Sequence, residues 1–162
     1  MPVSRRIRKA SKKIVAPAPE LPRIYVLVPQ TVTVVPEWGG YEGSPHQMNM
    51  EPGRLMAQVS HVVRKMQNYL TNVQWKESAR RKDESFNTCE EFTTIVLQVR
   101  NSDELSFMFN VLNGHISHSV WSFHDHNPDF YETEKRVLTA ICTSPVFPSE
   151  VAPYVKHLEL YR

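Results

Sequence analysis

The sequence predicts an α/β fold, a small mixed sheet of four strands with helices packed on it, in the order β-α-β-α-β-β-α. Apolar runs rich in β-branched residues alternate with segments whose apolar residues recur at helical spacing. Strands separated by helices imply parallel neighbours joined by right-handed crossovers, whereas the last two strands are adjacent in sequence and can pair antiparallel. The 162 residues, 41% hydrophobic and 22% charged, suffice for one domain with its own core.

The first predicted strand is followed by a long connection. Residues 24–28 form a continuous apolar run, which Pro29 is expected to end. Residues 29–49, called the 29–49 excursion below, lack helical periodicity and predict a long loop or a hairpin. Long loops in compact domains often carry function, so we expect a protein partner here.

An amphipathic helix is predicted to begin at Pro52 and Gly53. Gln58, His61 and Lys65 lie off its apolar stripe, and we expect them to point away from the core. The stripe consists of Leu55, Val59, Val62, Met66 and Leu70.

The second half of the chain supplies the remaining elements. Residues 92–99 form the clearest strand of the sequence. Asn101, followed by two acidic residues, predicts a helix start with an N-cap and favourable charges at the positive end of the helix dipole. The other expected elements are strands over 119–123 and 136–142, a helix that Ser149 caps and that runs to about 157, and an alternating edge segment over 158–161.

The positive charge of the chain is concentrated at its N-terminus. Residues 1–22 carry six Lys or Arg and one acid, a balance of +5, whereas 23–162 carry 13 bases and 16 acids, a balance of −3. We therefore predict a flexible, basic, proline-rich tail over 1–22 and a domain over 23–162. Residues 5–13 would bind RNA phosphates without sequence specificity; the alternatives are a solubilising disordered terminus and an organelle presequence.

Composition narrows the class of protein further. No segment approaches the roughly 18 apolar residues of a membrane span, so we expect no membrane partner. Two cysteines without a Cys-x-x-Cys pair favour a reducing compartment, and we predict a cytoplasmic location, with organelle import through the basic N-terminus as the alternative. His124 and His126 have a spacing that would suit a transition metal, but we favour polar residues lining a groove and predict neither metal nor cofactor.

Several segments together resemble one family. Residues 49–61 resemble the signature of the type II peptidyl-tRNA hydrolases, the archaeal and eukaryotic form, and residues 57–61 match its Ala-Gln-x-Ser/Ala-His motif. Residues 121–125 look like the family's strand that ends in an aspartate, and residues 157–161 look like its C-terminus. The resemblance covers about 23–162 in the same element order and implies the fold of that family.

The resemblance also implies an activity: hydrolysis of the ester between a peptide and the terminal ribose of tRNA, without a metal. Asp125 would orient a water molecule, assisted by Gln58 or Ser60. The residues implied to bind the substrate, tRNA or another RNA, are Arg54, Asn49, His61 and His124.

The match is incomplete at positions that the family uses. Asn49 and Pro52 stand where the family has two lysines. Residues 126–129 replace the family's Ala-Gly-Arg-Thr, and Thr133 or Thr139 would have to supply the missing hydroxyl.

These losses leave a second function open. The protein would keep the fold without the catalysis and serve as an RNA- or protein-binding scaffold. It would then act through the 29–49 excursion and the basic tail. A homodimer is a further candidate assembly.

Overall fold

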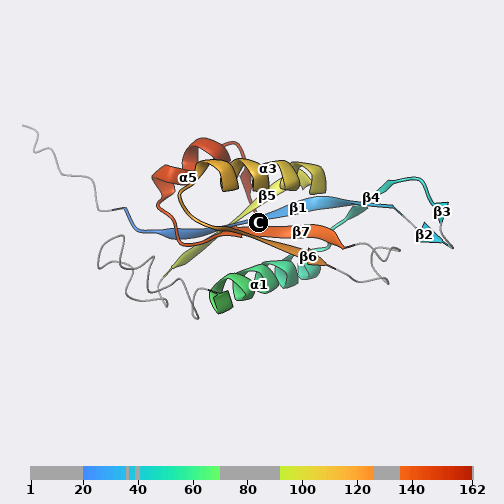
Figure 1. Ribbon diagram of the computed structural model, residues 1–162, viewed down its shortest axis with the longest axis horizontal. Helices are drawn as coiled ribbons and strands as arrows, with labels where there is room; N and C mark the ends of the chain where they lie inside the picture. The colour runs from blue at the N-terminus through green and yellow to red at the C-terminus, as the bar shows by residue number, and fades with distance from the viewer. Residues whose placement is uncertain (1–19, 36, 39–40, 70–91, 126–135, 162) are drawn as a thin grey trace, which may run out of the picture.

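A computed structural model describes residues 20–35, 37–38, 41–69, 92–125 and 136–161. Its strands and helices, labelled as in Figure 1, are β1 (Arg23–Val34), β2 (Glu37–Trp38), β3 (Tyr41–Glu42), β4 (His46–Asn49), α1 (Pro52–Tyr69), β5 (Thr93–Asn101), α3 (Ser102–His115), β6 (Val120–Asp125), β7 (Val137–Thr143), α5 (Pro148–Val155) and β8 (Glu159–Leu160).

Six of the strands form one mixed sheet. Its order is β6-β7-β1-β5-β8, and β4 pairs with β1. β1 and β5 are parallel and are joined through α1, whereas the other pairs in this sheet are antiparallel. The predicted α/β class and element order are confirmed, but the sheet has six strands instead of four, because β4 and β8 add to it.

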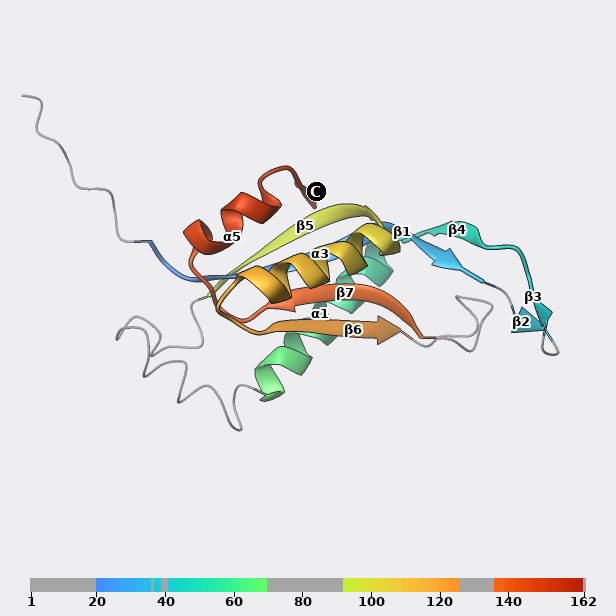
Figure 2. The ribbon, with the colours of Figure 1, turned by 45° about the horizontal axis from the view of Figure 1, so that its top comes forward.

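The sheet separates two helical layers. α1 covers one face, and α3 and α5 cover the other (Figures 1 and 2). Central strand β1 supplies both cores, since successive side chains of a strand point to opposite faces. Ile24, Val26 and Val28 pack on the α1 side, and Tyr25 and Leu27 pack on the α3 and α5 side.

The 29–49 excursion is a hairpin. The prediction that the first strand ends at Pro29 was wrong, because β1 continues to Val34 and pairs antiparallel with β4. β2 and β3 pair with each other farther out along the hairpin. Pro29 falls between the stretch of β1 that pairs with β7, at Val26 and Leu27, and the stretch that pairs with β4, from Thr31 onward. A residue without an N–H is tolerated where the strand changes its neighbour. The hairpin extends away from one end of the sheet (Figure 2).

Helix α1 confirms most of its predicted stripe. Leu55, Val59, Val62 and Met66 are buried, and Leu70 lies outside the described residues. The prediction for Gln58 was wrong, because its side chain is also buried, with 5% exposed.

The predicted start of α3 is confirmed by its cap. Asn101 Oδ1 accepts a hydrogen bond from the Glu104 N–H at 2.9 Å. The Glu104 carboxylate in turn accepts one from the Arg100 N–H at 2.6 Å. Two side chain–backbone bonds therefore fix the first turn, an arrangement similar to a capping box except that Glu104 bonds the N–H of Arg100, the residue before the N-cap.

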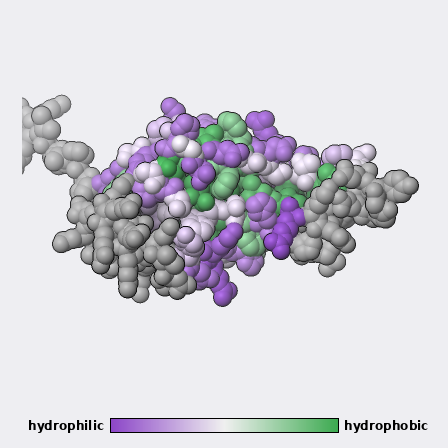
Figure 3. All heavy atoms as spheres, viewed as in Figure 1, coloured by the Kyte–Doolittle hydropathy of each residue, from purple (hydrophilic) through white to green (hydrophobic). Residues whose placement is uncertain are grey.

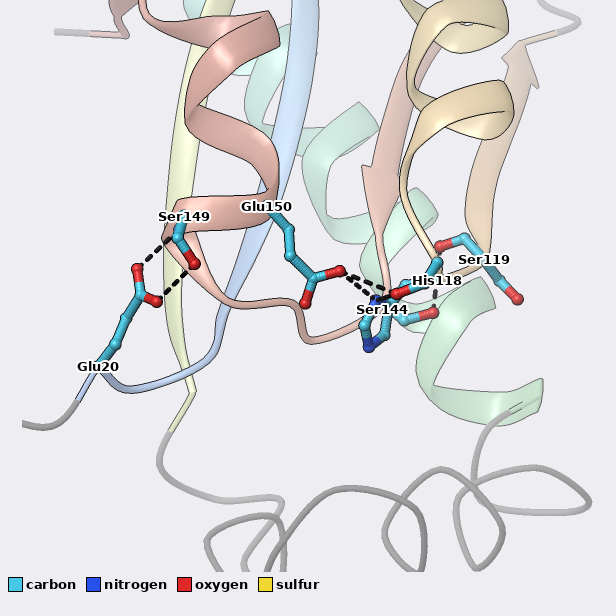
Figure 4. A network of polar contacts seen from close by, with 7 residues as sticks. Glu20, His118, Ser119, Ser144, Ser149 and Glu150 are labelled. Atoms are coloured by element: carbon cyan, nitrogen blue, oxygen red, sulfur yellow. Dashed lines mark hydrogen bonds and ion pairs between the residues drawn. The ribbon is translucent and has the colours of Figure 1, made fainter.

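Helix α5 has a different cap from the predicted one. The helix begins at Pro148, one residue before Ser149, and its N-cap Phe147 makes no side-chain cap bond. Instead, the Glu20 carboxylate accepts two hydrogen bonds from Ser149, one from the N–H and one from Oγ, both at 2.7 Å (Figure 4). The segment that leads into β1 is thereby attached to α5, and Pro22 is buried beside it. Residues 1–19 lie outside the described residues.

We expect Glu20→Ala to lower the free energy of unfolding by about 1 kcal/mol, because it removes the acceptor for an N-terminal N–H of α5. Urea denaturation measures this change. Glu159→Ala, which removes an exposed glutamate from β8, is the control. Equal stability of the two variants would contradict a capping role for Glu20.

Candidate active site

Helix α1 and edge strand β6 run antiparallel and touch along most of their lengths. The α1 residues concerned are three or four positions apart, so they share one helix face. We call this line of contact the α1–β6 seam. Its contacts, in order along α1, are Gln58 Nε2 to Asp125 Oδ2 at 2.9 Å, the His61 ring stacked on Phe123 with centroids 4.9 Å apart, Lys65 Nζ to the Ser122 carbonyl at 2.8 Å, and the Tyr69 ring 4.5 Å from Trp121.

A polar cluster occupies the end of the seam near the start of α1. Thr139 on β7 donates its hydroxyl hydrogen to Gln58 Oε1 at 2.9 Å, and Gln58 Nε2 donates to Asp125 Oδ2. Thr139 is fully buried, Gln58 is nearly so, and Asp125 is partly exposed. We call these three residues the Gln58–Asp125–Thr139 cluster. It places a carboxylate at the surface on a buried, hydrogen-bonded support.

The orientation of the Gln58 amide follows from its two partners. An ionised Asp125 can only accept, so the NH2 group of Gln58 must face it and the carbonyl oxygen must face Thr139. The second carboxylate oxygen of Asp125, Oδ1, has no hydrogen-bond partner among the described residues. The cluster therefore holds one oxygen of Asp125 and leaves the other available to a water molecule or a substrate.

The other residues implied to take part lie at different distances from this cluster. Arg54 is exposed on α1 one turn before Gln58, on the same side of the helix. Asn49 is the exposed last residue of β4, where it pairs with Thr31. Ser60 lies on another face of α1, where it lines a shallow groove between α1 and β5. The structure does not bring Ser60 to the cluster.

His61 lies on the seam beyond the cluster, whereas His124 lies on β6 between the seam residues Phe123 and Asp125 and pairs with Leu138. Both are exposed, and His61 covers the ring of Phe123. Partial burial, followed by the positive charges of Lys65 and Arg136, lowers the pKa of His124. The neutral imidazole is therefore favoured around neutral pH.

This environment predicts a pH dependence. Native His124 takes up its proton at lower pH than unfolded His124, whose pKa is about 6.5. Its contribution to stability is thus complete above about pH 6.5 and is lost as the pH falls through the lower native pKa. We expect Lys65→Gln to raise the pKa of His124 in an NMR titration, since it removes a like charge. Arg64→Gln should leave that pKa unchanged, and a drop in the Lys65→Gln variant would contradict the assignment.

Sequence reasoning found most of the cluster but not its arrangement. Thr139 was one of two threonines considered for the hydroxyl; the other, Thr133, lies outside the described residues, as do residues 126–129. The burial of Gln58 was missed, although the Ala-Gln-x-Ser-His match pointed to this residue. Among the described residues, no group of three or more His, Cys, Asp or Glu is arranged to hold a metal. No described helix is long and apolar enough to cross a membrane.

One family model matches most of the chain. The family model described as peptidyl-tRNA hydrolase PTH2 matches residues 45–161, more than two thirds of the chain. The chain belongs to this family. The PTH2 match begins next to β4 and includes α1, β6 and β7, and therefore the whole Gln58–Asp125–Thr139 cluster, whereas β1 precedes it. A search of curated proteins finds no match to the chain.

Proposed function

We propose that this PTH2 family protein hydrolyses the ester that links a peptide to the terminal ribose of tRNA, at the Gln58–Asp125–Thr139 cluster. The observation that carries the proposal is that only one of the two carboxylate oxygens of Asp125 is bonded by a described residue. Gln58 bonds Oδ2, and within the described part of the chain no residue bonds Oδ1 of this partly exposed side chain. A carboxylate held in this way can position a water molecule and accept its proton.

The proposed reaction needs one water molecule and no other reactant. The water oxygen attacks the ester carbonyl carbon while its proton passes to Asp125 Oδ1. The resulting tetrahedral intermediate then breaks the bond to the ribose oxygen, which takes the proton back from Asp125. The products are the free peptide and deacylated tRNA, and Asp125 returns to its starting state.

Thr139 and Gln58 act in this scheme as positioning residues. Gln58 bonds the Asp125 oxygen that does not react, and Thr139 fixes the Gln58 amide from the buried side. Between the two assisting residues that the family resemblance implied, the geometry favours Gln58 over Ser60, because Ser60 lines the groove on another face of α1.

Substrate binding is assigned to the residues around the cluster. Arg54, one helical turn from Gln58, would contact a phosphate of the tRNA 3′ end, since guanidinium groups bind phosphate well. Asn49 would offer a neutral hydrogen bond where the family has a lysine. His61 and His124 would line the path of the RNA. The basic residues of 5–13 would add contacts without sequence specificity, and the site of action would be the cytoplasm.

The test is release of the blocked amino acid from an N-blocked aminoacyl-tRNA by the purified full chain, with tRNA binding measured on the same preparation. The proposal predicts release that is proportional to protein concentration and far above the rate in buffer. Binding of tRNA without release would instead support the alternative, an inactive member of the family that serves as an RNA-binding scaffold.

A further inference from the structure

Strand β7 contains a β-bulge at Thr139, beside the proposed site. Phe123 of β6 pairs with Ala140, but the next residue, His124, pairs with Leu138. Thr139 therefore has no partner on β6, and β7 has one residue more than β6 at this point. Bulges are frequent next to active sites, where they change the direction of a side chain.

The bulge reverses the alternation of side chains along β7. Ala140 packs in the core on the α1 side of the sheet, and Ile141 packs in the core on the α3 side. Continued without a break, this alternation would turn position 139 toward α3 and position 138 toward α1. The structure has the opposite arrangement, because Leu138 packs on the α3 side and the Thr139 hydroxyl bonds Gln58 of α1.

The side chains of β6 alternate regularly beside this bulge. Phe123 packs on the α1 side, and Asp125, two residues later, bonds Gln58 on the same side. In a regular pairing the β7 residue opposite Asp125 would be Leu138, but with the bulge it is Val137. The hydroxyl of the cluster therefore comes from an additional residue of β7, which is fully buried between two paired positions.

This position lets Thr139 hold the buried end of the Gln58 amide. Hydrophilic side chains gather over α1 on the lower side of the molecule (Figure 3), but the side chain of Gln58 is only 5% exposed. Its Oε1 accepts from Thr139 and its Nε2 donates to Asp125, both at 2.9 Å. Loss of the Thr139 donor would leave a buried carbonyl oxygen unpaired and free the amide to turn away from Asp125.

We propose that the bulge at Thr139 is a positioning element of the proposed active site. The additional residue of β7 turns the Thr139 hydroxyl to the α1 side, where it holds Gln58 and, through Gln58, Asp125. This inference rests on the proposed function and assigns the assembly of its site to one irregularity of the sheet. The hydroxyl should then act only at position 139, and only while β7 keeps its additional residue.

The first test moves the hydroxyl by one residue without changing the length of the chain. Thr139→Val keeps the shape of the side chain but removes the hydroxyl. The double variant Leu138→Thr with Thr139→Val places a hydroxyl at the position that regular alternation would turn to α1. Single-turnover release from N-blocked aminoacyl-tRNA should fall about 10²-fold in both, the cost of a displacement of about 1 Å in an active site.

Two controls accompany these variants. Thr139→Ser keeps a hydroxyl at position 139 and should keep most of the rate, and Leu138→Thr alone should keep it as well. Affinity for deacylated tRNA should be the same in all four variants, since the bulge acts on Asp125 and not on RNA binding. Recovery of the rate in the double variant, relative to Thr139→Val, would overturn the role of the bulge.

The second test removes the bulge itself and has a readout that does not depend on hydrolysis. Deletion of Leu138 would pair Thr139 with His124 and turn its hydroxyl toward α3, while Val137 stays opposite Asp125. NMR then measures hydrogen exchange of the Gln58 side-chain amide. Exchange should be about tenfold faster in the deletion variant than in Leu138→Ala, which loses the same side chain but keeps the bulge.

The two readouts separate this inference from the proposed function. Faster exchange in the deletion variant, with no ester release by the unmodified protein, would refute the hydrolysis and leave the bulge as the element that holds Gln58. Equal exchange and equal release in the deletion variant and in Leu138→Ala would refute the role of the bulge and leave the hydrolysis. The substitutions of the first test keep the length of β7, so they decide the question even if the deletion variant does not fold.

Discussion

Asp125→Asn should slow ester release by about 10²–10⁴-fold, the usual contribution of a positioned general base. An amide oxygen cannot take a proton from water at neutral pH, so the variant can still hold a water molecule but cannot activate it. The fold should persist, because an Asn at this position can still hydrogen-bond to Gln58 after rotation of either amide.

Release under single-turnover conditions, with protein in excess over N-blocked aminoacyl-tRNA, measures this effect without a contribution from product release. Glu159→Gln makes the same change of charge on β8, at the opposite edge of the sheet from β6, and should leave the rate unchanged. An Asp125→Asn variant that releases the amino acid as fast as the unmodified protein would remove Asp125 from the mechanism.

Gln58→Leu should affect stability and activity together. The substitution keeps the approximate size of the side chain but leaves the buried Thr139 hydroxyl with only a 3.5 Å contact to the Phe123 carbonyl. A buried polar group that loses its partner costs about 1–3 kcal/mol. Asp125 would lose its only described donor at the same time, so we expect a large drop in the rate of release as well.

The double variant Gln58→Leu with Thr139→Val separates the two effects. Replacing both partners by apolar groups leaves no buried hydroxyl without a partner, so much of the lost stability should return. Activity should not return, because Asp125 still lacks its support. Urea denaturation and single-turnover release are measured on the same preparations. If the double variant loses more unfolding free energy than the two single variants lose together, this account of the cluster is contradicted.

The order of elements could be predicted because its signals are local. The apolar stripe of α1 and the cap at Asn101 each depend on residues three or four positions apart. The cap is confirmed, and so is the stripe from Leu55 to Met66. The end of the first strand could not be predicted in the same way. Pro29 lacks an N–H, but its sequence neighbours do not show that β1 exchanges β7 for β4 at this position.

The site was only partly predictable because its contacts are long-range. Gln58 is buried through a hydrogen bond to a residue 67 positions away, and Glu20 reaches Ser149 across 129 positions. Helical periodicity places Gln58 off the apolar stripe and cannot reveal a polar partner on a strand. The family motif identified Gln58 and Asp125 individually, and the structure shows that Thr139 joins them.

The central claim is that Asp125 activates a water molecule which attacks the ester directly. A single turnover in H₂¹⁸O, followed by mass spectrometry of the released N-blocked amino acid and of the protein, tests this claim. Direct attack predicts one ¹⁸O atom in the carboxylate of the product and none in the protein. Product that carries only ¹⁶O, together with one ¹⁸O atom in Asp125, would show that Asp125 itself attacks the ester and that water then attacks the Asp125 carbonyl. No release above buffer would show that the chain does not catalyse this reaction.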